Sequence, residues 1–111
     1  VVIQMPADEH DRALAVTSHV PHLIAAALAA TIPETYFRLS GAGLLDATRI
    51  AAGDPELWKQ IFSHNRPKVL AALQAFEKQL TAMRTALQQG DDSALEGLLK
   101  IAKKVRDALG S

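Results

Sequence analysis

The chain has 111 residues, of which 49% are hydrophobic and 22% are charged, and its 12 Lys and Arg residues balance its 12 Asp and Glu residues. A chain of this length forms one domain with a substantial core. Because its charges balance, nothing in its electrostatics predicts binding to nucleic acid or to a membrane surface. The absence of cysteine excludes disulfides and thiolate metal sites, in agreement with a reducing, cytoplasmic compartment.

The first residues differ in pattern from the rest of the chain. Residues 1–3 are a short β-branched, strand-like run, and Pro6 follows them closely. The chain begins with Val1 rather than Met, and no cationic segment followed by a hydrophobic one opens it, as a secretory signal would. We therefore expect a piece of a longer protein, in which residues 1–7 are the remnant of a linker and residues 8–111 form a helical domain.

Residues 13–32 contain no Asp, Glu, Lys or Arg. Twenty uncharged residues would be long enough to span a membrane. We reject a span because the segment is built largely from alanine, carries Thr, Ser and His side chains, and has Pro21 near its middle. Apolar residues recur at three- and four-residue steps, which predicts a helix buried on most sides, with Asp8 as its N-cap, an end near Ala30 and a bend near Pro21.

The rest of the chain also has helical patterns. Turn and capping residues predict helices over residues 33–39, 44–52 and 55–64, a long helix between Asn65 as its cap and Gly90, and a last helix from residue 91 or 92 to about 109. The last two helices each carry a coiled-coil-like apolar stripe, and the short turn between them requires antiparallel packing. The stripes consist of Val69, Leu73, Phe76, Leu80, Met83 and Leu87 in one helix and of Leu95, Leu98, Ala102, Val105 and Leu109 in the other. The predicted fold class is all-α.

Ser18, His19 and His22 are polar residues in the uncharged helix. In a mostly dry place each of them needs a hydrogen-bond partner or a ligand. His19 and His22 are three residues apart and share a face, which is compatible with two ligands of one metal ion. The plainer interpretation is a pair of buried imidazoles that bond the backbone or a partner helix. Ser18 and His19 are adjacent and point about 100° apart, so we do not expect a hydrolase triad.

His10 and Asp11 match, as a bare dipeptide, the signature of the metal-dependent phosphohydrolases named after it. Those enzymes need further His and Asp ligands, and Asp46 and Asp54 are the nearby candidates. We favour a first helical turn whose charges suit the helix dipole. A metal-dependent hydrolase that also uses the histidine pair is an alternative of lower rank.

Asp46 and Arg49 are also three residues apart, so an ion pair on one helix is the plain interpretation. Arg49 is nevertheless flanked by small and apolar residues, where we expect its guanidinium to be partly desolvated and suited to holding a carboxylate by two bonds. We interpret Trp58 as a core residue rather than as a platform for a ligand. The residues by themselves predict a pocket that offers imidazoles and one guanidinium to an anionic ligand.

Taken in order, these residues resemble a known pattern. The order runs His10-Asp11, residues 17–22 (TSHVPH), residues 43–51 (GLLDATRIA), residues 54–58 (DPELW) and Asn65. It resembles the C-terminal helical domain of the prephenate/arogenate dehydrogenase family over nearly the whole chain, and SHxPH and DxTRIA are its most specific elements. The implied fold is an all-α dimerisation domain like the C-terminal domain of 6-phosphogluconate-dehydrogenase-like enzymes.

The resemblance implies a function for the protein that carries this chain. In that family an N-terminal Rossmann domain binds NAD or NADP, and the C-terminal helices form a homodimer and close the substrate cleft. The implied reaction is the oxidative decarboxylation of prephenate or arogenate on the route to tyrosine, with hydride transfer to the nicotinamide. The family's catalytic histidine belongs to the nucleotide-binding domain, so we expect no catalytic, cofactor-binding or metal-binding residue in this chain.

The resemblance also implies roles for individual residues. Arg49 matches the arginine that binds a substrate carboxylate, and His22 and His19 line the same cleft. Ser18, Asp46 and Trp58 then take cleft-lining or gating positions.

Two features set this chain apart from a complete enzyme of that family. Leu44 and Leu45 stand where the family has aromatic and basic residues before the Asp. The sequence also has no GxGxxG and no strand-helix alternation, so we expect the chain by itself neither to bind the cofactor nor to turn over substrate. The alternative from another functional class is a purely structural helical dimerisation module whose polar residues are buried pairs.

Overall fold

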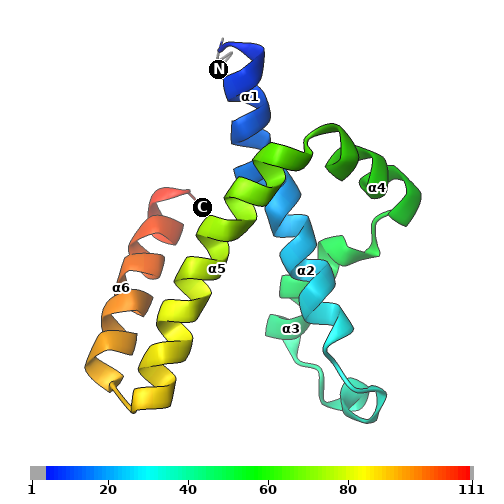
Figure 1. Ribbon diagram of the computed structural model, residues 1–111. Coiled ribbons are helices and arrows are strands. Elements are labelled where there is room, and N and C mark those ends of the chain that lie inside the picture. Colours follow the sequence, from blue (N-terminus) through cyan, green and yellow to red (C-terminus); the bar gives the residue numbers. More distant parts are fainter. Residues whose placement is uncertain (1–4, 111) are drawn as a thin grey trace. The chain divides into compact units, whose positions relative to one another are not determined.

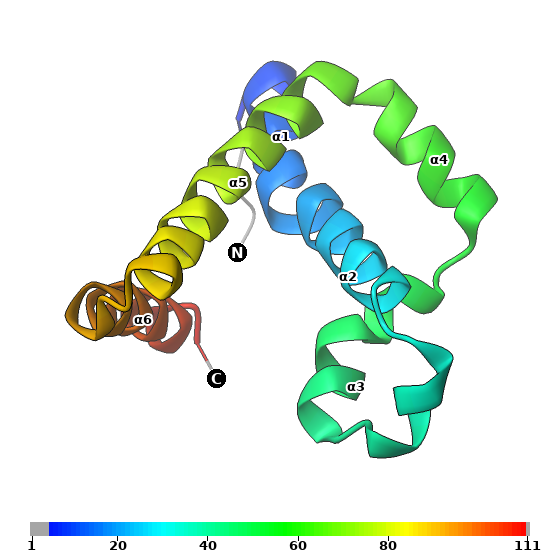
Figure 2. The same cartoon turned by 60° about the horizontal axis from the view of Figure 1, so that its bottom comes forward.

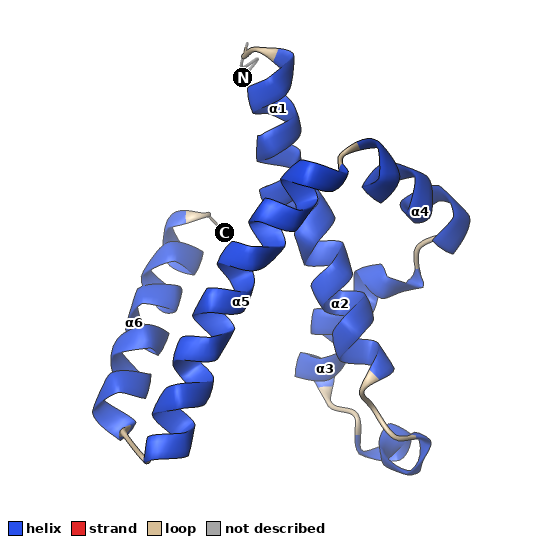
Figure 3. Ribbon diagram, viewed as in Figure 1, coloured by secondary structure: helices blue, strands red, loops and turns tan. Residues whose placement is uncertain are grey.

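The computed structural model describes residues 5–110, and every regular element in this range is helical (Figure 1, Figure 3). The all-α prediction is confirmed for this range, and the strand-like pattern of residues 1–3 lies outside it. In chain order the elements are α1 Ala7–Leu14, the π-helix η1 Ala15–His19, α2 Val20–Ala30, the 3₁₀ helix η2 Glu34–Leu39, α3 Ala42–Thr48, the 3₁₀ helix η3 Arg49–Ala52, α4 Pro55–His64, α5 Arg66–Gln89 and α6 Asp92–Ala108.

The chain forms two compact units, residues 1–73 and residues 74–111. The first unit contains α1 to α4 and the beginning of α5. Within it α2 packs against α3 and η3 (Figure 1, Figure 2). The second unit contains the rest of α5 and α6, which run antiparallel as predicted (Figure 1).

The predicted first helix is present, but its start and its irregularity differ from the prediction. Pro6, not Asp8, is the N-cap, and the His10 N–H donates to the Pro6 carbonyl at 2.9 Å. Asp8 lies in the first turn, where its carboxylate meets Lys68 Nζ at 2.7 Å. The irregularity near Pro21 takes the form of a π turn, η1. This turn directly precedes Pro21, whose missing N–H and bulky ring would disturb an α-helical bond to the Thr17 carbonyl.

The later helix boundaries follow their capping residues. Asp54 accepts the Glu56 N–H at 3.1 Å at the start of α4, and Asp91 accepts the Ala94 N–H at 3.0 Å at the start of α6. Gly90 has φ +63, the left-handed conformation that ends α5. The predicted helix over residues 44–52 begins two residues earlier and changes to the 3₁₀ form at Arg49.

The uncharged segment is less buried than predicted. Only Ala15, His19, Val20, His22 and Ala25 of this segment are buried, whereas the Val16 side chain is 58% exposed. So short a chain has too little mass by itself to cover a helix that is apolar on most sides, and the predicted burial of this helix relies on a second copy of the chain. By length and composition residues 7–30 could cross a membrane, a criterion that the core helix of a water-soluble protein also meets.

The apolar stripes predicted for the last two helices are only partly buried between α5 and α6. Ala86 is buried, and Phe76, Met83, Leu95 and Leu98 are partly buried. Exposed apolar side chains of the same unit are Leu80, Leu87, Leu99, Ile101, Val105 and Leu109. A pair of helices can bury only one face of each, so a wide apolar stripe leaves a second face uncovered.

Candidate functional site

The centre of the first unit is a stack of two rings. The His22 imidazole on α2 and the Trp58 indole on α4 lie with centroids 3.8 Å apart and planes inclined by 16°. His22 is buried and Trp58 is partly buried. The structure thus brings together two residues that were predicted separately, one as a ligand-binding imidazole and one as core.

Two further rings complete this aromatic cluster, which consists of His19, His22, Trp58 and Phe62. Phe62 lies one turn beyond Trp58 on α4, with centroids 5.7 Å apart. His19 presents its ring at a steep angle to both, with centroids 6.4 Å from Trp58 and 6.5 Å from Phe62. Edge-on contacts at these distances are favourable for aromatic pairs. Phe62 was not predicted as a site residue, because its helical spacing equally suits a core position.

A cavity of about 350 Å³ opens beside the stack. This volume lies at the lower end of the range of small-molecule sites. Its one charged side chain within the described residues is Lys59, which is exposed and paired with Glu56 at 3.0 Å. The lining is mainly apolar and consists of His22, Ala26, Ala51, Gly53, Pro55, Trp58, Lys59 and Phe62.

Gly53 is required by its contact with the stack. A Cβ atom at this position would lie 2.8 Å from Trp58 Nε1 and 3.1 Å from His22 Cε1. The first distance is shorter than real Cβ contacts allow, so any larger residue would displace the indole or the imidazole. In the sequence this glycine looks like an ordinary break before the Asp54 cap, and only the structure reveals its contact.

Asn65 forms polar contacts between distant parts of the first unit. Its side-chain Nδ2 donates to the Asp11 carbonyl at 2.8 Å and lies 3.3 Å from His19 Nδ1. Both the Asn65 and the His19 side chains are buried. Asn65 was predicted as the cap of α5, and a cap prediction contains no information about a partner 54 residues away.

His22 differs from His19 in its hydrogen bonding. Its Nδ1 is the one fully buried side-chain nitrogen or oxygen in the described part of the chain without a hydrogen-bond partner. A buried polar atom in this state is costly and is a common mark of a ligand or water site.

Arg49 and Asp46 do not join the aromatic cluster in the structure of the single chain. Both side chains are exposed, so the expected desolvation of the Arg49 guanidinium is absent. Nor do they pair with each other or with any other charge among residues 5–110. The physical reason is that η3 carries Arg49 on the outside of the chain. Ala51 and Gly53, two and four residues later, line the cavity.

The remaining predictions for the site concern Ser18 and a metal ion. Ser18 is partly buried within η1. Within the described range no three His, Asp or Glu side chains lie close enough together to hold a metal ion. Metal sites in hydrolases need at least three protein ligands, so this geometry gives the hydrolase alternative no support.

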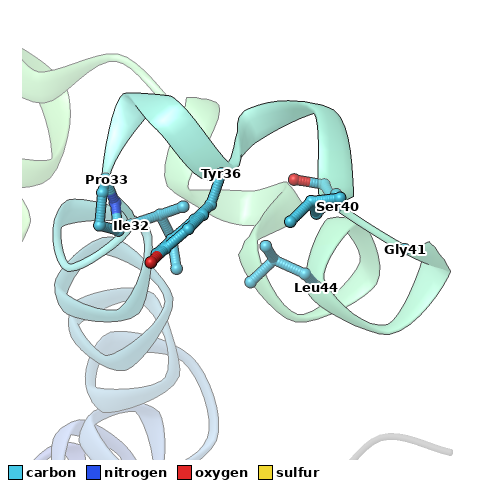
Figure 4. A pocket seen from close by; sticks show the side chains of 7 residues that line it. Ile32, Pro33, Tyr36, Ser40, Gly41 and Leu44 are labelled. Carbon is cyan, nitrogen blue, oxygen red and sulfur yellow. The ribbon is translucent and has the colours of Figure 1, made fainter.

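A second cavity lies at the other end of α2. It measures about 370 Å³ and is lined by Ile32, Pro33, Tyr36, Leu39, Ser40, Gly41 and Leu44. In Figure 4 Tyr36 lies over Ile32 and Pro33, and Leu44 points into the space between them and Ser40. This lining contains no charged residue. It therefore suits an apolar group rather than the anion predicted for the histidine site.

Comparison with known proteins identifies the family. The model of the family described as "Prephenate dehydrogenase, dimerization domain" matches residues 6–101. The chain belongs to this family. The resemblance that the SHxPH and DxTRIA elements indicated is confirmed.

Relatives of this family match along nearly the whole chain. The prephenate dehydrogenase of Bacillus subtilis is 33% identical over an alignment of 116 positions, which covers 96% of this chain and 30% of the relative. The cyclohexadienyl dehydrogenase of Zymomonas mobilis is 38% identical over an alignment of 112 positions, which covers 95% of this chain and 38% of the relative. The chain thus spans about a third of the length of these curated relatives.

Solved structures of prephenate and arogenate dehydrogenases have the same fold. The crystal structure of the A. aeolicus prephenate dehydrogenase in complex with hydroxyphenyl propionate and NAD⁺ matches with a TM-score of 0.88 and 34% identity, over 99% of this chain and 41% of that one. The Synechocystis arogenate dehydrogenase matches with a TM-score of 0.87 and 28% identity, over 98% of this chain and 42% of that one. The helical dimerisation-domain fold of the family is therefore confirmed for this chain.

Proposed function

We propose that this chain is the substrate-binding and dimerisation domain of an NAD- or NADP-dependent prephenate or arogenate dehydrogenase. The observation that carries the proposal is the family match over residues 6–101. Its relatives bear the names prephenate, cyclohexadienyl and arogenate dehydrogenase. The reaction would be the oxidative decarboxylation of a cyclohexadienyl substrate, in the cytoplasm and on the route to tyrosine.

We propose that the nicotinamide cofactor binds outside this chain. A dinucleotide site of the Rossmann type needs a strand, a glycine-rich turn and a helix N-terminus in succession. The sequence has no GxGxxG, and residues 5–110 form no strand. We therefore assign NAD or NADP to a separate nucleotide-binding domain, joined through residues 1–7 to the helical domain of residues 8–111.

The role proposed for this chain is to hold the substrate. Arg49 would bind a carboxylate, because an exposed guanidinium without an ion pair among residues 5–110 is free to take an anionic ligand. His22 and His19 would face the substrate from the aromatic cluster. Trp58 would form one wall of the cavity through its stack with His22, and Asp46 and Ser18 would line or gate the same cleft.

A homodimer is part of the proposal. The family is described by its dimerisation function, and this chain leaves large apolar side chains exposed in both units, among them Val16, Leu45, Leu87 and Ile101. Exposed apolar area on this scale marks an interaction surface. A second copy of the chain would cover it, whereas the balanced charges favour neither nucleic acid nor a membrane surface.

The test is the catalytic efficiency of the intact polypeptide that carries this chain, assayed with prephenate and arogenate and with NAD and NADP. We expect Arg49→Ala to lower kcat/KM by roughly 100-fold, since a substrate carboxylate would lose a charged two-bond partner. Arg38→Ala is the matched control, because Arg38 is another exposed arginine in a short 3₁₀ helix. Arg38→Ala should leave kcat/KM within about twofold.

Two results would contradict this proposal in different ways. Near-normal kcat/KM in Arg49→Ala would remove Arg49 from the site while leaving the enzyme assignment intact. No turnover of any substrate and cofactor pair by the intact wild type would favour the purely structural dimerisation module.

A further inference from the structure

The contacts of Asn65 determine which of its side-chain atoms faces His19. The Asp11 carbonyl oxygen can only accept hydrogen bonds, so the side-chain atom 2.8 Å from it must be the amide nitrogen. The same nitrogen lies 3.3 Å from His19 Nδ1. An amide nitrogen carries two hydrogens, and this arrangement directs one to each acceptor.

The orientation of the amide in turn determines the state of the His19 ring. A nitrogen that receives a hydrogen bond must present a lone pair, so Nδ1 has no proton. A neutral imidazole then carries its proton on Nε2. The other tautomer would set an N–H of the ring against an N–H of the amide, with no acceptor between them.

The Nε2 edge of His19 is the edge that remains available. Within residues 5–110 no residue forms a hydrogen bond with His19 Nε2. The one fully buried side-chain nitrogen or oxygen without a partner in this range is His22 Nδ1, not His19 Nε2. Within residues 5–110 Nε2 thus has no protein partner, in a residue that is 8% exposed as a whole. The rings of Trp58 and Phe62 flank the same imidazole.

We propose that Asn65 is a positioning residue that holds His19 as the Nε2–H tautomer, so that His19 presents an N–H donor to an oxygen atom of the ligand. The tautomer rests on the geometry above, and the ligand rests on the proposed function. A carboxylate, carbonyl or hydroxyl oxygen fits such a donor, whereas an N–H or ammonium group does not. In this state Nε2 does not act as a base.

The test of the tautomer uses histidine labelled with ¹⁵N in the intact polypeptide and long-range ¹H–¹⁵N spectra, which distinguish the two neutral ring forms. The exposed His10 and His64 serve as internal references. We expect wild-type His19 to give the Nε2–H pattern. Asn65→Asp replaces the amide donor by an acceptor and should move His19 toward Nδ1–H, and Asn65→Ala should give a mixture of both forms.

The spectra overturn the tautomer assignment if wild-type His19 is the Nδ1–H form or a mixture, or if a folded Asn65→Asp protein keeps the wild-type pattern. The wild-type spectrum decides by itself if both variants fail to fold.

The test of the ligand role is the division of the kinetic effect of Asn65→Ala between KM and kcat. Loss of one neutral hydrogen bond to substrate should raise KM roughly fivefold to tenfold and leave kcat within about twofold. A purely structural role would reduce the active fraction, and hence kcat, without changing KM. If Asn65→Ala alters the tautomer of His19 but leaves KM unchanged, His19 has no role in ligand binding. If the intact wild type is inactive, the proposed function is refuted, while the spectra still decide the tautomer.

Discussion

The two compact units differ in what holds their elements together. In the first unit the decisive contacts join distant parts of the chain, such as the Asn65 bond to Asp11 and the stack of His22 on Trp58. In the second unit the polar contacts are local, with Asp91 capping α6 and lysines pairing with carboxylates four residues away. Substitutions in the first unit should therefore disturb contacts between distant segments, whereas substitutions in the second unit should disturb only local contacts.

The largest contrast is expected between two glycines. Gly53→Val should destabilise the protein by about 3 kcal/mol, because any Cβ at this position collides with the ring stack. Gly97→Ala, in the interior of α6 with nothing within 4 Å of the added Cβ, should instead stabilise it by about 0.5–1 kcal/mol. Urea unfolding of both variants at one fixed protein concentration measures this pair. Equal effects of the two substitutions would mean that the stack does not constrain Gly53.

The next contrast separates folding from association in the second unit. The Leu87 side chain is 67% exposed within the chain, so Leu87→Gln should change the free energy of folding of the chain by no more than about 0.5 kcal/mol. If a second copy covers this leucine, the dimer dissociation constant should rise about tenfold through lost apolar burial. Light scattering over a dilution series measures it, with the neighbouring exposed Gln88→Ala as control. An unchanged dissociation constant would exclude Leu87 from the dimer interface.

The smallest effect concerns charge pairing in the first unit. Lys68, through its hydrogen bond and its charge, holds the pKa of Asp8 below the ordinary value of 3.8, with a further contribution from Arg12. A lowered pKa in the folded state adds stability above the unfolded pKa, and this stability is lost as the pH falls through the folded pKa. Asp8→Asn should therefore lower Tm slightly at neutral pH and match the wild type in strong acid.

Salt provides the control for this pair. The Asp8 side chain is 71% exposed, so the difference in Tm should shrink in 1 M salt, where the screening length is about 3 Å. Glu9→Gln removes a first-turn carboxylate without an ion pair among the described residues, so it loses only the interaction with the helix dipole and should lower Tm at neutral pH by less than Asp8→Asn. A difference between Asp8→Asn and wild type that persists in strong acid would rule out the ion pair as its cause.

Local sequence patterns were enough to predict the helices and most of their ends. Periodicity and capping chemistry act within a few residues, which is why Asp54, Gly90 and Asp91 lie where they were predicted. The order of the SHxPH and DxTRIA elements also indicated the family. Asp8 is the exception among the caps, because α1 begins before it, at Ala7, and its carboxylate meets Lys68 on α5.

Which polar groups meet and which apolar faces are covered depends on the packing of segments that are distant in the sequence. The partners of Asn65, the collision that excludes a side chain at Gly53 and the exposure of Arg49 depend on where segments tens of residues apart cross in space. Burial of the uncharged helix depends likewise on how much chain is available to cover it. Local patterns determine which way a side chain faces on its own helix, and the packing of distant segments determines what that side chain contacts.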